Sequence, residues 1–223
     1  MSYKLGVIGG MGPLATEIFY KYIIDNTPAN SDQEHIDMVI LSHATIPDRT
    51  TEILNGLNNY IEVVKKDFDI LNNIGVCAIA IPCNTSHYFY ERMCEFTNIP
   101  IINMVEETIK RCKEEGYKKV SVLGTYGTVN SKVYDKYAQK HDIEIVTLDD
   151  EDKKDIMEII YWVKATNNQR SERFLEIVDK YSQNSKVILA CTELSVLDLD
   201  DREVVDALKV LGDESIKRCG YGI

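Results

Sequence analysis

The sequence predicts an α/β protein made of two similar parallel-sheet α/β halves that are related by a pseudo-twofold axis, with the active site in the cleft between them. Short aliphatic runs alternate with longer segments of helical period, which is typical of parallel sheets covered by helices. A segment near the start of the chain recurs 115 residues later. In each half, an aliphatic run also ends in cysteine followed closely by threonine.

The expected elements follow in chain order. Strands are predicted where short runs are aliphatic and β-branched, near residues 4–9, 37–42, 76–81, 100–103, 119–123, 143–148 and 186–190. Helices are predicted where apolar residues recur at helical spacing, near residues 14–26, 57–74, 85–96, 105–115, 128–140, 151–164, 171–182 and 203–218. Gly75 and Gly116 stand where a glycine is expected to end a helix.

The internal repeat carries the prediction of two halves. Residues 4–22 (KLGVIGGMGPLATEIFYKY) align without a gap on residues 119–137 (KVSVLGTYGTVNSKVYDKY), so that Gly12 pairs with Gly127. Self-similarity of this kind indicates a repeated structural unit. Each unit is expected to supply a strand, a tight loop and a helix.

Two motifs place a cysteine at the same point of each half: AIAIPCNT contains Cys83 and VILACTE contains Cys191. We expect the first half to comprise residues 1–100 with the C-terminal helix 203–223, and the second half to comprise residues 101–202. Ligands of open α/β sheets bind beyond the carboxyl ends of the strands, where both cysteines stand. A pseudo-twofold axis would bring the two thiols face to face across the cleft.

Composition limits the classes of partner and the compartment. The chain has 223 residues, of which 44% are hydrophobic and 27% charged, as in ordinary globular proteins. No apolar run approaches the roughly 20 residues that span a bilayer, and the N-terminal segment does not read as a signal peptide, so a cytoplasmic location is expected. The formal charge of -11 argues against nucleic acid and anionic membrane as partners. Six cysteines without a CxxC pair predict free thiols. Of these, Cys77 is interpreted as a core residue, and Cys94, Cys112 and Cys219 as small apolar residues packed inside helical segments.

Two opposed thiols suit proton transfer at a carbon atom. One thiolate can remove a proton while the other group, as a thiol, returns a proton to the opposite face. This exchange inverts configuration without a cofactor. A local positive field would favour it by lowering the pKa of the thiol that acts as base.

Residues after each cysteine are expected to supply that field. Asn84, Thr85 and Ser86 are favoured helix caps. A helix that begins directly after the first cysteine would lower the pKa of the thiol and hold a carboxylate on its free N–H groups. In the second half, Thr192 offers a hydroxyl at the matching place and Glu193 is suited to orient nearby groups.

Four motifs resemble the aspartate/glutamate racemase superfamily, and within it the aspartate racemases. They are GVIGGMGPLAT, IPDRT, IPCNTSH and LACTEL, which stand in the family's order and spacing over nearly the whole chain. The resemblance implies an isomerase that racemises aspartate, and also glutamate, without a cofactor. It further implies a small acidic amino acid as the substrate and a homodimer as the assembly.

Carried over by position, the resemblance implies that Cys83 and Cys191 are the acid-base residues and that Arg49 clamps the distal carboxylate. The expected substrate-binding residues are Met11, Arg49, Asn84, Thr85, Ser86, Thr192 and Lys164. The family's lysine commonly follows a tyrosine by four residues, whereas Lys164 follows Tyr161 by three. Either a small helix shift brings Lys164 to the pocket, or its role weakens and the preference between aspartate and glutamate blurs.

Alternative readings stay open at this level. The loop GMGPLA formally fits a dinucleotide fingerprint, but His43 stands where an acid should bind the ribose. Cys83-x-x-x-His87 could be half of a metal site, yet no second pair has ligand spacing, so no metal is expected. The resemblance also leaves open two reactions of superfamily relatives, maleate isomerisation and hydantoin racemisation. A further alternative is a protein that binds an acidic amino acid without catalysis.

Overall fold

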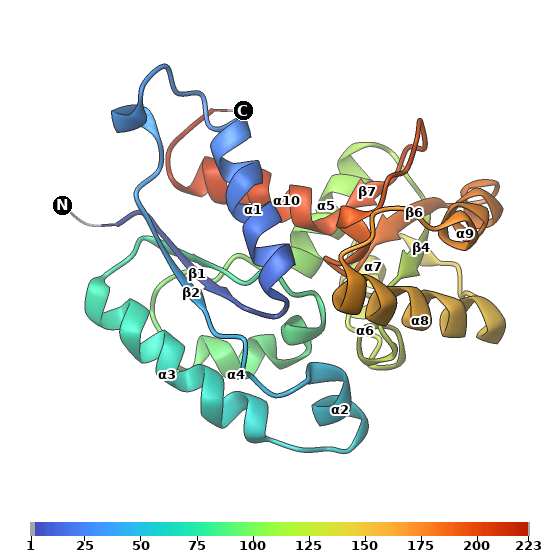
Figure 1. Cartoon of the computed structure of the whole chain (residues 1–223), viewed down its shortest axis with the longest axis horizontal. Helices are drawn as coiled ribbons and strands as arrows, with labels where there is room; N and C mark the ends of the chain where they lie inside the picture. Colours follow the sequence, from blue (N-terminus) through green and yellow to red (C-terminus); the bar gives the residue numbers. More distant parts are fainter. Residues whose placement is uncertain (1–2, 223) are drawn as a thin grey trace.

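Two parallel sheets form the frame of residues 3–222, the part of the chain that the computed structural model describes (Figure 1). The first sheet has the strand order β2-β1-β3, with β1 at Leu5–Gly9, β2 at Met38–Ser42 and β3 at Ala78–Ala80. The second has the order β5-β4-β6-β7, with β4 at Lys119–Leu123, β5 at Glu144–Ile145, β6 at Lys186–Leu189 and β7 at Val205–Asp206. Every strand pair is parallel. In both sheets the first strand lies between the second and the third, which confirms the predicted pair of similar halves.

Helices cover both faces of both sheets. Those of the first repeat and the connection are α1 Pro13–Asn26, α2 Arg49–Leu54, α3 Asn59–Ile74, α4 Tyr90–Cys94 and α5 Met104–Glu114. The rest are α6 Tyr126–Asn130, α7 Asp135–Lys140, α8 Asp150–Thr166, α9 Glu172–Ser182 and α10 Ala207–Arg218. None of the helices within residues 3–222 has the length and apolarity needed to cross a bilayer.

Four hydrophobic clusters, one on each sheet face, hold these layers together. On the first sheet, α3 packs on one face and α1 with α10 on the other. On the second sheet, α8 and α9 cover one face and α5 with α7 the other. The strands are buried on both faces, which is why they read as continuous aliphatic runs in the sequence.

Helix α10 ties the two halves together. Its residues Leu208 and Leu211 pack in the core of the first sheet, whereas Val210 packs in the core of the second. The Asp213 carboxylate of α10 accepts a hydrogen bond from the Tyr22 hydroxyl of α1 at 2.6 Å and one from the Arg111 guanidinium of α5 at 2.9 Å. Three helices from distant parts of the sequence therefore meet at one carboxylate.

The structure corrects several predicted strand boundaries. Residues 100–103 do not form a full strand, because Ile101 makes only an isolated parallel bridge to Ile79. The strand predicted at 143–148 is reduced to the two residues of β5. Residues 205–206, predicted as the start of a helix, pair with β6 as strand β7. The α10 helix begins only after Asp206, whose carboxylate accepts a hydrogen bond from the Leu208 N–H.

Two helices also differ from prediction. The predicted helix 128–140 is divided into α6 and α7, because Lys132 between them has a φ of 55°, a left-handed conformation that a helix cannot contain. Helix α2 was not predicted from the pattern. It is only six residues long and is capped by Asp48, whose side chain accepts a hydrogen bond from the Thr51 N–H.

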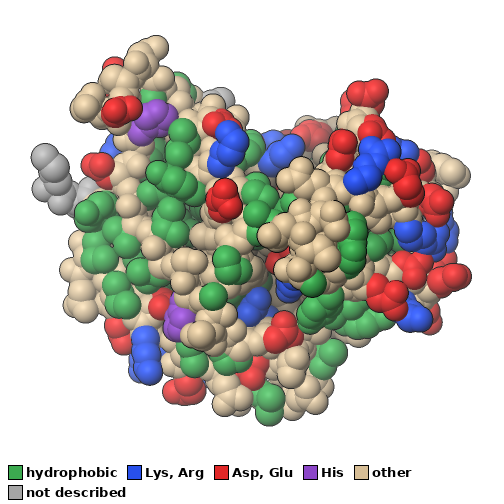
Figure 2. Space-filling model, viewed as in Figure 1, with side chains coloured by type: hydrophobic (Ala, Val, Ile, Leu, Met, Phe, Trp, Pro, Cys, Tyr) green, Lys and Arg blue, Asp and Glu red, His purple; other side chains and the backbone are tan. Residues whose placement is uncertain are grey.

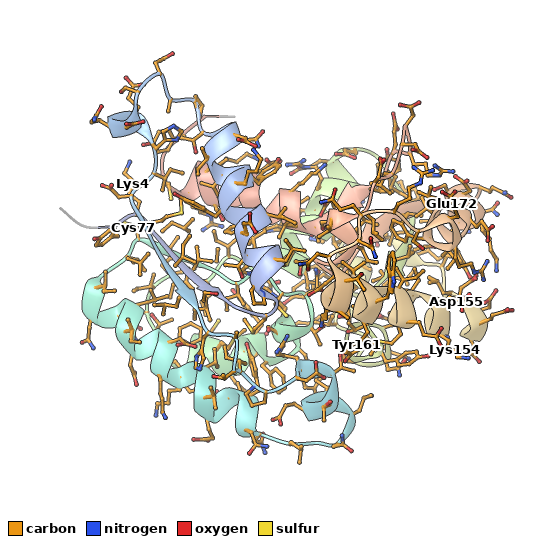
Figure 3. All side chains as sticks on the ribbon, viewed as in Figure 1. Lys4, Cys77, Lys154, Asp155, Tyr161 and Glu172 are labelled. Atoms are coloured by element: carbon orange, nitrogen blue, oxygen red, sulfur yellow. The ribbon has the colours of Figure 1, made fainter. Side chains whose placement is uncertain are left out.

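All six cysteines are free thiols, as predicted. Cys112 and Cys219 are buried small residues of the core, also as predicted. Cys77 and Cys94 are exposed, which corrects their interpretation as core residues. Cys77 precedes β3 and lies beside Lys4, at the end of the first sheet that is remote from the second half (Figure 3).

Substitution of Gly212 tests the packing of α1 on α10. A Cβ atom at Gly212 would lie 2.3 Å from the Tyr22 ring, so Gly212→Ala overpacks this contact. We expect the free energy of unfolding to fall by about 1–3 kcal/mol, measured by urea denaturation. The control is Gly222→Ala, because nothing lies within 4 Å of a Cβ there. Equal stability of the two variants would contradict the packing account.

Candidate active site

Cys83 and Cys191 line the same small cavity between the two halves. Cys83 follows β3 and Cys191 follows β6, so the strands deliver both thiols to the carboxyl ends of the sheets, where the cleft was predicted. The cavity has a volume of about 10 Å³, about the least that holds one water molecule. Its lining residues are Met11, Asp48, Arg49, Thr50, Cys83, Asn84, Thr85, Thr125, Lys164, Cys191, Thr192 and Glu193.

The lining set includes every predicted site residue except Ser86. The Ser86 hydroxyl instead points at the Met11 sulfur, 3.5 Å away, and its side chain is fully buried behind the cavity wall. Asp48, Thr50 and Thr125 also line the cavity, although none was predicted as a site residue. Thr125 could have been predicted from the sequence, because the internal repeat aligns its loop with the first glycine-rich loop, which contains the predicted site residue Met11.

The predicted helix after Cys83 is corrected. Residues Thr85–Phe89 form a 3₁₀ turn, η2, and only the short α4 follows. Asn84 has helical backbone angles and its side chain makes no capping hydrogen bond. The Asn84 and Thr85 side chains bond to the second half, and the Ser86 hydroxyl bonds to Met11, instead of capping the local backbone. No α-helix begins directly after Cys83, so the positive field that was expected there from a helix N-terminus has no source.

Two glycines let the halves approach each other closely at the site. A Cβ at Gly12, in the first half, would lie 3.2 Å from Glu193 Oε1 of the second. A Cβ at Gly127, in the second half, would lie 2.8 Å from Thr85 Cγ2 and 2.9 Å from Thr50 Cα of the first. Gly12 and Gly127 are paired in the internal repeat, and their contacts Glu193 and Thr85 each stand two residues after a cysteine. The two halves therefore make equivalent contacts across the cleft, in which the glycine of each half packs against the residue two positions after the cysteine of the other half.

Hydroxyl groups join the halves beside this contact. Thr85 Oγ1 lies 3.0 Å from Thr125 Oγ1 and 2.9 Å from Thr128 Oγ1, and all three side chains are buried. Buried hydroxyls need hydrogen-bond partners, so this cluster favours the closed arrangement of the two halves.

The Cys191 thiol is held in its protonated form. Burial disfavours the thiolate, and the Glu193 carboxylate adds repulsion, so the pKa of Cys191 lies well above its ordinary value. The thiol donates a hydrogen bond to Glu193 Oε2 at 3.0 Å. Lys164 opposes the effect only in part, with its Nζ 3.9 Å from Glu193 Oε1.

Arg49 is a buried cation with an unused donor. Its Nη1 donates to the Pro47 carbonyl at 3.0 Å and its Nη2 to the Met11 carbonyl at 3.3 Å, while its buried Nε has no partner. Burial opposes the charge, but the neighbouring Cys83 sulfur and Asp48 carboxylate outweigh it and raise the pKa of Arg49. The guanidinium stays charged beside the cavity.

Lys164 reaches the cavity despite its altered spacing from Tyr161. It lies in the last turn of α8, with its Nζ 5.0 Å from the centroid of the Tyr161 ring. Figure 3 shows Tyr161 on the side of α8 that faces α2. Burial disfavours the ammonium, yet the nearby Glu193 carboxylate keeps the pKa of Lys164 above its ordinary value.

The Asn84 amide supplies a second unused donor. Its Oδ1 accepts a hydrogen bond from the Tyr134 hydroxyl at 2.5 Å, whereas its buried Nδ2 has no partner. Buried donors without partners are uncommon in proteins. With the Arg49 Nε, the Asn84 Nδ2 makes the cavity suited to a ligand that carries negatively charged oxygens.

The structure weakens the metal and dinucleotide alternatives. His87 is buried, with its Nδ1 2.9 Å from the Cys83 carbonyl and its Nε2 accepting from the Met104 N–H at 3.2 Å, so the backbone uses both ring nitrogens. Burial lowers the pKa of His87, which keeps the ring neutral. A Cβ at Gly10 would lie 2.4 Å from the His43 backbone. The close packing of Gly10 on the His43 backbone therefore accounts for a glycine at this turn without a bound nucleotide.

A larger groove adjoins the cavity. It has a volume of about 480 Å³ and shares four lining residues with the cavity, namely Met11, Arg49, Lys164 and Glu193. In Figure 2 the surface is hollowed between the two halves, and Lys or Arg side chains lie in the hollow. A net negative protein thus presents positive charge where its two halves meet.

Comparison with known proteins identifies a common family. The family model of the Asp/Glu/Hydantoin racemases matches residues 8–211. The broad specificity amino-acid racemase RacX of Bacillus subtilis is 31% identical over 210 residues, which cover 90% of each chain. The solved aspartate racemase of Picrophilus torridus has a TM-score of 0.85 at 28% identity, covering 99% of this chain and 96% of that one. The glutamate racemase of Aquifex pyrophilus is 27% identical over 73% of this chain and 67% of its own.

The pair of Cys191 and Glu193 predicts a measurable change in thiol reactivity. Because the carboxylate stabilises the S–H form, Glu193→Gln lowers the pKa of Cys191 toward its ordinary value. Carboxamidomethylation of Cys191 by iodoacetamide, followed by peptide mass spectrometry, should then have its midpoint at lower pH than in wild type. The control variant is Glu203→Gln, whose side chain is 90% exposed. An unchanged midpoint in Glu193→Gln would show that the carboxylate does not hold the proton.

Proposed function

Because this chain belongs to the Asp/Glu/Hydantoin racemase family, we propose that it is an amino-acid racemase that interconverts L- and D-aspartate, and also glutamate, by proton transfer between two thiols and Cα. The observation that carries the proposal is the placement of Cys83 and Cys191 at equivalent strand ends, lining one cavity. We further propose that the enzyme needs no cofactor and acts in the cytoplasm as a homodimer.

The proposed step moves one proton at each face of the substrate. A thiolate takes the proton from Cα and becomes a thiol, and the electron pair stays on the substrate as a carbanion. The opposite thiol gives its proton to the other face of Cα and becomes a thiolate. No proton is gained or lost, and the enzyme is left ready for the reverse direction.

The two thiols are not equivalent in the resting enzyme. Cys191 carries its proton, because it is buried and hydrogen-bonded to Glu193. We therefore assign Cys191 as the acid for one enantiomer and Cys83 as the base that removes the proton. For the other enantiomer the roles are exchanged: Cys191 acts as the thiolate and Cys83 as the thiol, which is the state in which turnover of the first enantiomer leaves the enzyme.

The substrate class rests on the two unpartnered donors. Aspartate and glutamate each carry two carboxylates, and the cavity offers the Arg49 Nε and the Asn84 Nδ2 at separate points of its wall. We propose that Arg49 binds the distal carboxylate and Asn84, with Thr85, the α-carboxylate. Lys164 adds charge near the distal group, although Glu193 neutralises part of it.

Substrate has to reach a cavity that is closed. The cavity of about 10 Å³ is too small for an amino acid, whereas the adjoining groove of about 480 Å³ is not. We propose that the halves separate at the shared wall of Met11, Arg49, Lys164 and Glu193 and close again around the substrate. Closure would exclude water and strengthen every charge interaction inside.

Proton exchange at Cα tests the proposed activity. In deuterium oxide without added cofactor, we expect solutions of L- and of D-aspartate to lose their optical rotation when wild-type protein is added. We also expect deuterium to be introduced at Cα. The signals are followed by polarimetry and proton NMR over a panel that includes glutamate, alanine, maleate and a hydantoin. Binding without exchange would indicate an amino-acid binding protein, and turnover of maleate or hydantoin alone would indicate another reaction of the superfamily.

The same assay tests the two-thiol mechanism. Cys83→Ala and Cys191→Ala should each abolish racemisation, because inversion needs a proton donor and an acceptor on opposite faces. Cys94→Ala is the matched control, since Cys94 is an exposed thiol that does not line the cavity. Near-normal turnover in both directions by either active-site variant would rule the mechanism out.

Charge removal tests the distal clamp. We expect Arg49→Gln to reduce kcat/KM for aspartate by about 10- to 150-fold, the loss of a hydrogen bond to a charged group. Lys164→Gln should reduce it less, because Glu193 already neutralises part of the Lys164 charge. Steady-state kinetics with both aspartate enantiomers provides the measurement. A larger loss in Lys164→Gln than in Arg49→Gln would reverse the assignment of the two cations.

A further inference from the structure

Tyr134 reaches from the second half into the wall of the active site. It immediately precedes α7, its side chain is 2% exposed, and its hydroxyl donates to Asn84 Oδ1 at 2.5 Å. Asn84 belongs to the first half and follows Cys83 directly. The bond therefore crosses the cleft and ends one residue away from a proposed acid-base cysteine.

The direction of this hydrogen bond determines how the Asn84 amide is turned. Burial raises the pKa of Tyr134, so the hydroxyl keeps its proton and needs an acceptor. The Asn84 Oδ1 is that acceptor, which forces the Nδ2 group to point the other way. If the amide were turned over, the Tyr134 hydroxyl could only accept from the Nδ2 group, and its own proton would lose Asn84 as its acceptor.

The Nδ2 group so placed is the one that lacks a partner. Asn84 is 2% exposed and lines the cavity, and its Nδ2 has no hydrogen-bond acceptor within the described residues. An asparagine alone could present either its oxygen or its nitrogen to a ligand. A carboxylate is bound only if the nitrogen is presented, because the amide oxygen would repel it.

We propose that Tyr134 is a positioning residue that holds the Asn84 amide with its N–H donors toward the α-carboxylate of the substrate. This inference rests on the proposed function, since it assumes that the substrate carries that carboxylate. It also makes the carboxylate site dependent on closure, because the second half must be in place for the first half to present its donor.

Tyr137 offers a matched comparison one helical turn away. It is also buried, at 8% exposure, and its hydroxyl accepts from the Asn103 Nδ2 at 2.7 Å. Neither Tyr137 nor Asn103 lines the cavity. Tyr137→Phe therefore removes a buried hydroxyl from the same region without removing the hydrogen bond to Asn84.

The test compares Tyr134→Phe with Tyr137→Phe in steady-state racemisation of aspartate. For Tyr134→Phe we expect KM to rise about 5- to 30-fold, the loss of one buried hydrogen bond, with kcat changed less than about threefold. Tyr137→Phe should leave KM unchanged. In an Asn84→Ala background, Tyr134→Phe should have no further effect on KM, because residues that act through one another are not additive.

Additive effects in this double-mutant cycle, or an equal rise of KM in Tyr137→Phe, would overturn the proposal. Should Tyr134→Phe fail to fold by circular dichroism, Asn84→Asp replaces it, because the carboxyl still accepts from Tyr134 but offers no N–H. An unchanged KM in Asn84→Asp would equally overturn the proposal.

Failure of the proposed function can be distinguished from failure of the positioning role of Tyr134. If wild type does not racemise aspartate, the proposed function fails, and the same variants are compared by calorimetric titration with aspartate. A weaker affinity confined to Tyr134→Phe then supports the positioning role, and equal affinities reject it. Wild type that neither racemises nor binds aspartate overturns both proposals.

Discussion

The close contact between the two halves at Gly12 and Gly127 is the constraint on which the site depends. Each glycine leaves room for a side chain that stands two residues after the opposite cysteine, Glu193 in one case and Thr85 in the other. A Cβ atom at Gly127 would meet the Thr50 backbone at 2.9 Å and hold the halves apart. Only this approach makes one cavity out of two strand ends, and it leaves a volume of about 10 Å³.

Closure also determines the electrostatics of the site. Charge interactions are stronger in the protein interior than in water, so the buried Glu193 carboxylate acts on the buried Cys191 thiol with little screening. The chain carries a formal charge of -11, which repels an acidic substrate at long range. Arg49 and Lys164, gathered beside the cleft, provide the local attraction that such a substrate needs.

Much of the fold was predictable because its signals are local. Aliphatic runs mark the buried strands, and the repeat pairs Gly12 with Gly127 before any contact is known. The helix predicted after Cys83 is misplaced because tertiary contacts replace local ones. Asn84, Thr85 and Ser86 read as helix caps, but they bond to Tyr134, Thr125, Thr128 and Met11, so the expected helix is a 3₁₀ turn.

The sequence by itself determined the α/β class, the two halves and the positions of both cysteines. Aliphatic strand patterns and an internal repeat can be recognised along the chain without knowledge of any tertiary contact. The tertiary structure alone decided that Lys164 lines the cavity, that the Cys191 thiol donates a hydrogen bond to Glu193, and that the Tyr134 hydroxyl bonds to Asn84. These are contacts between side chains on different elements. Their distances depend on how helices pack and how far the halves close, which no spacing along the chain encodes.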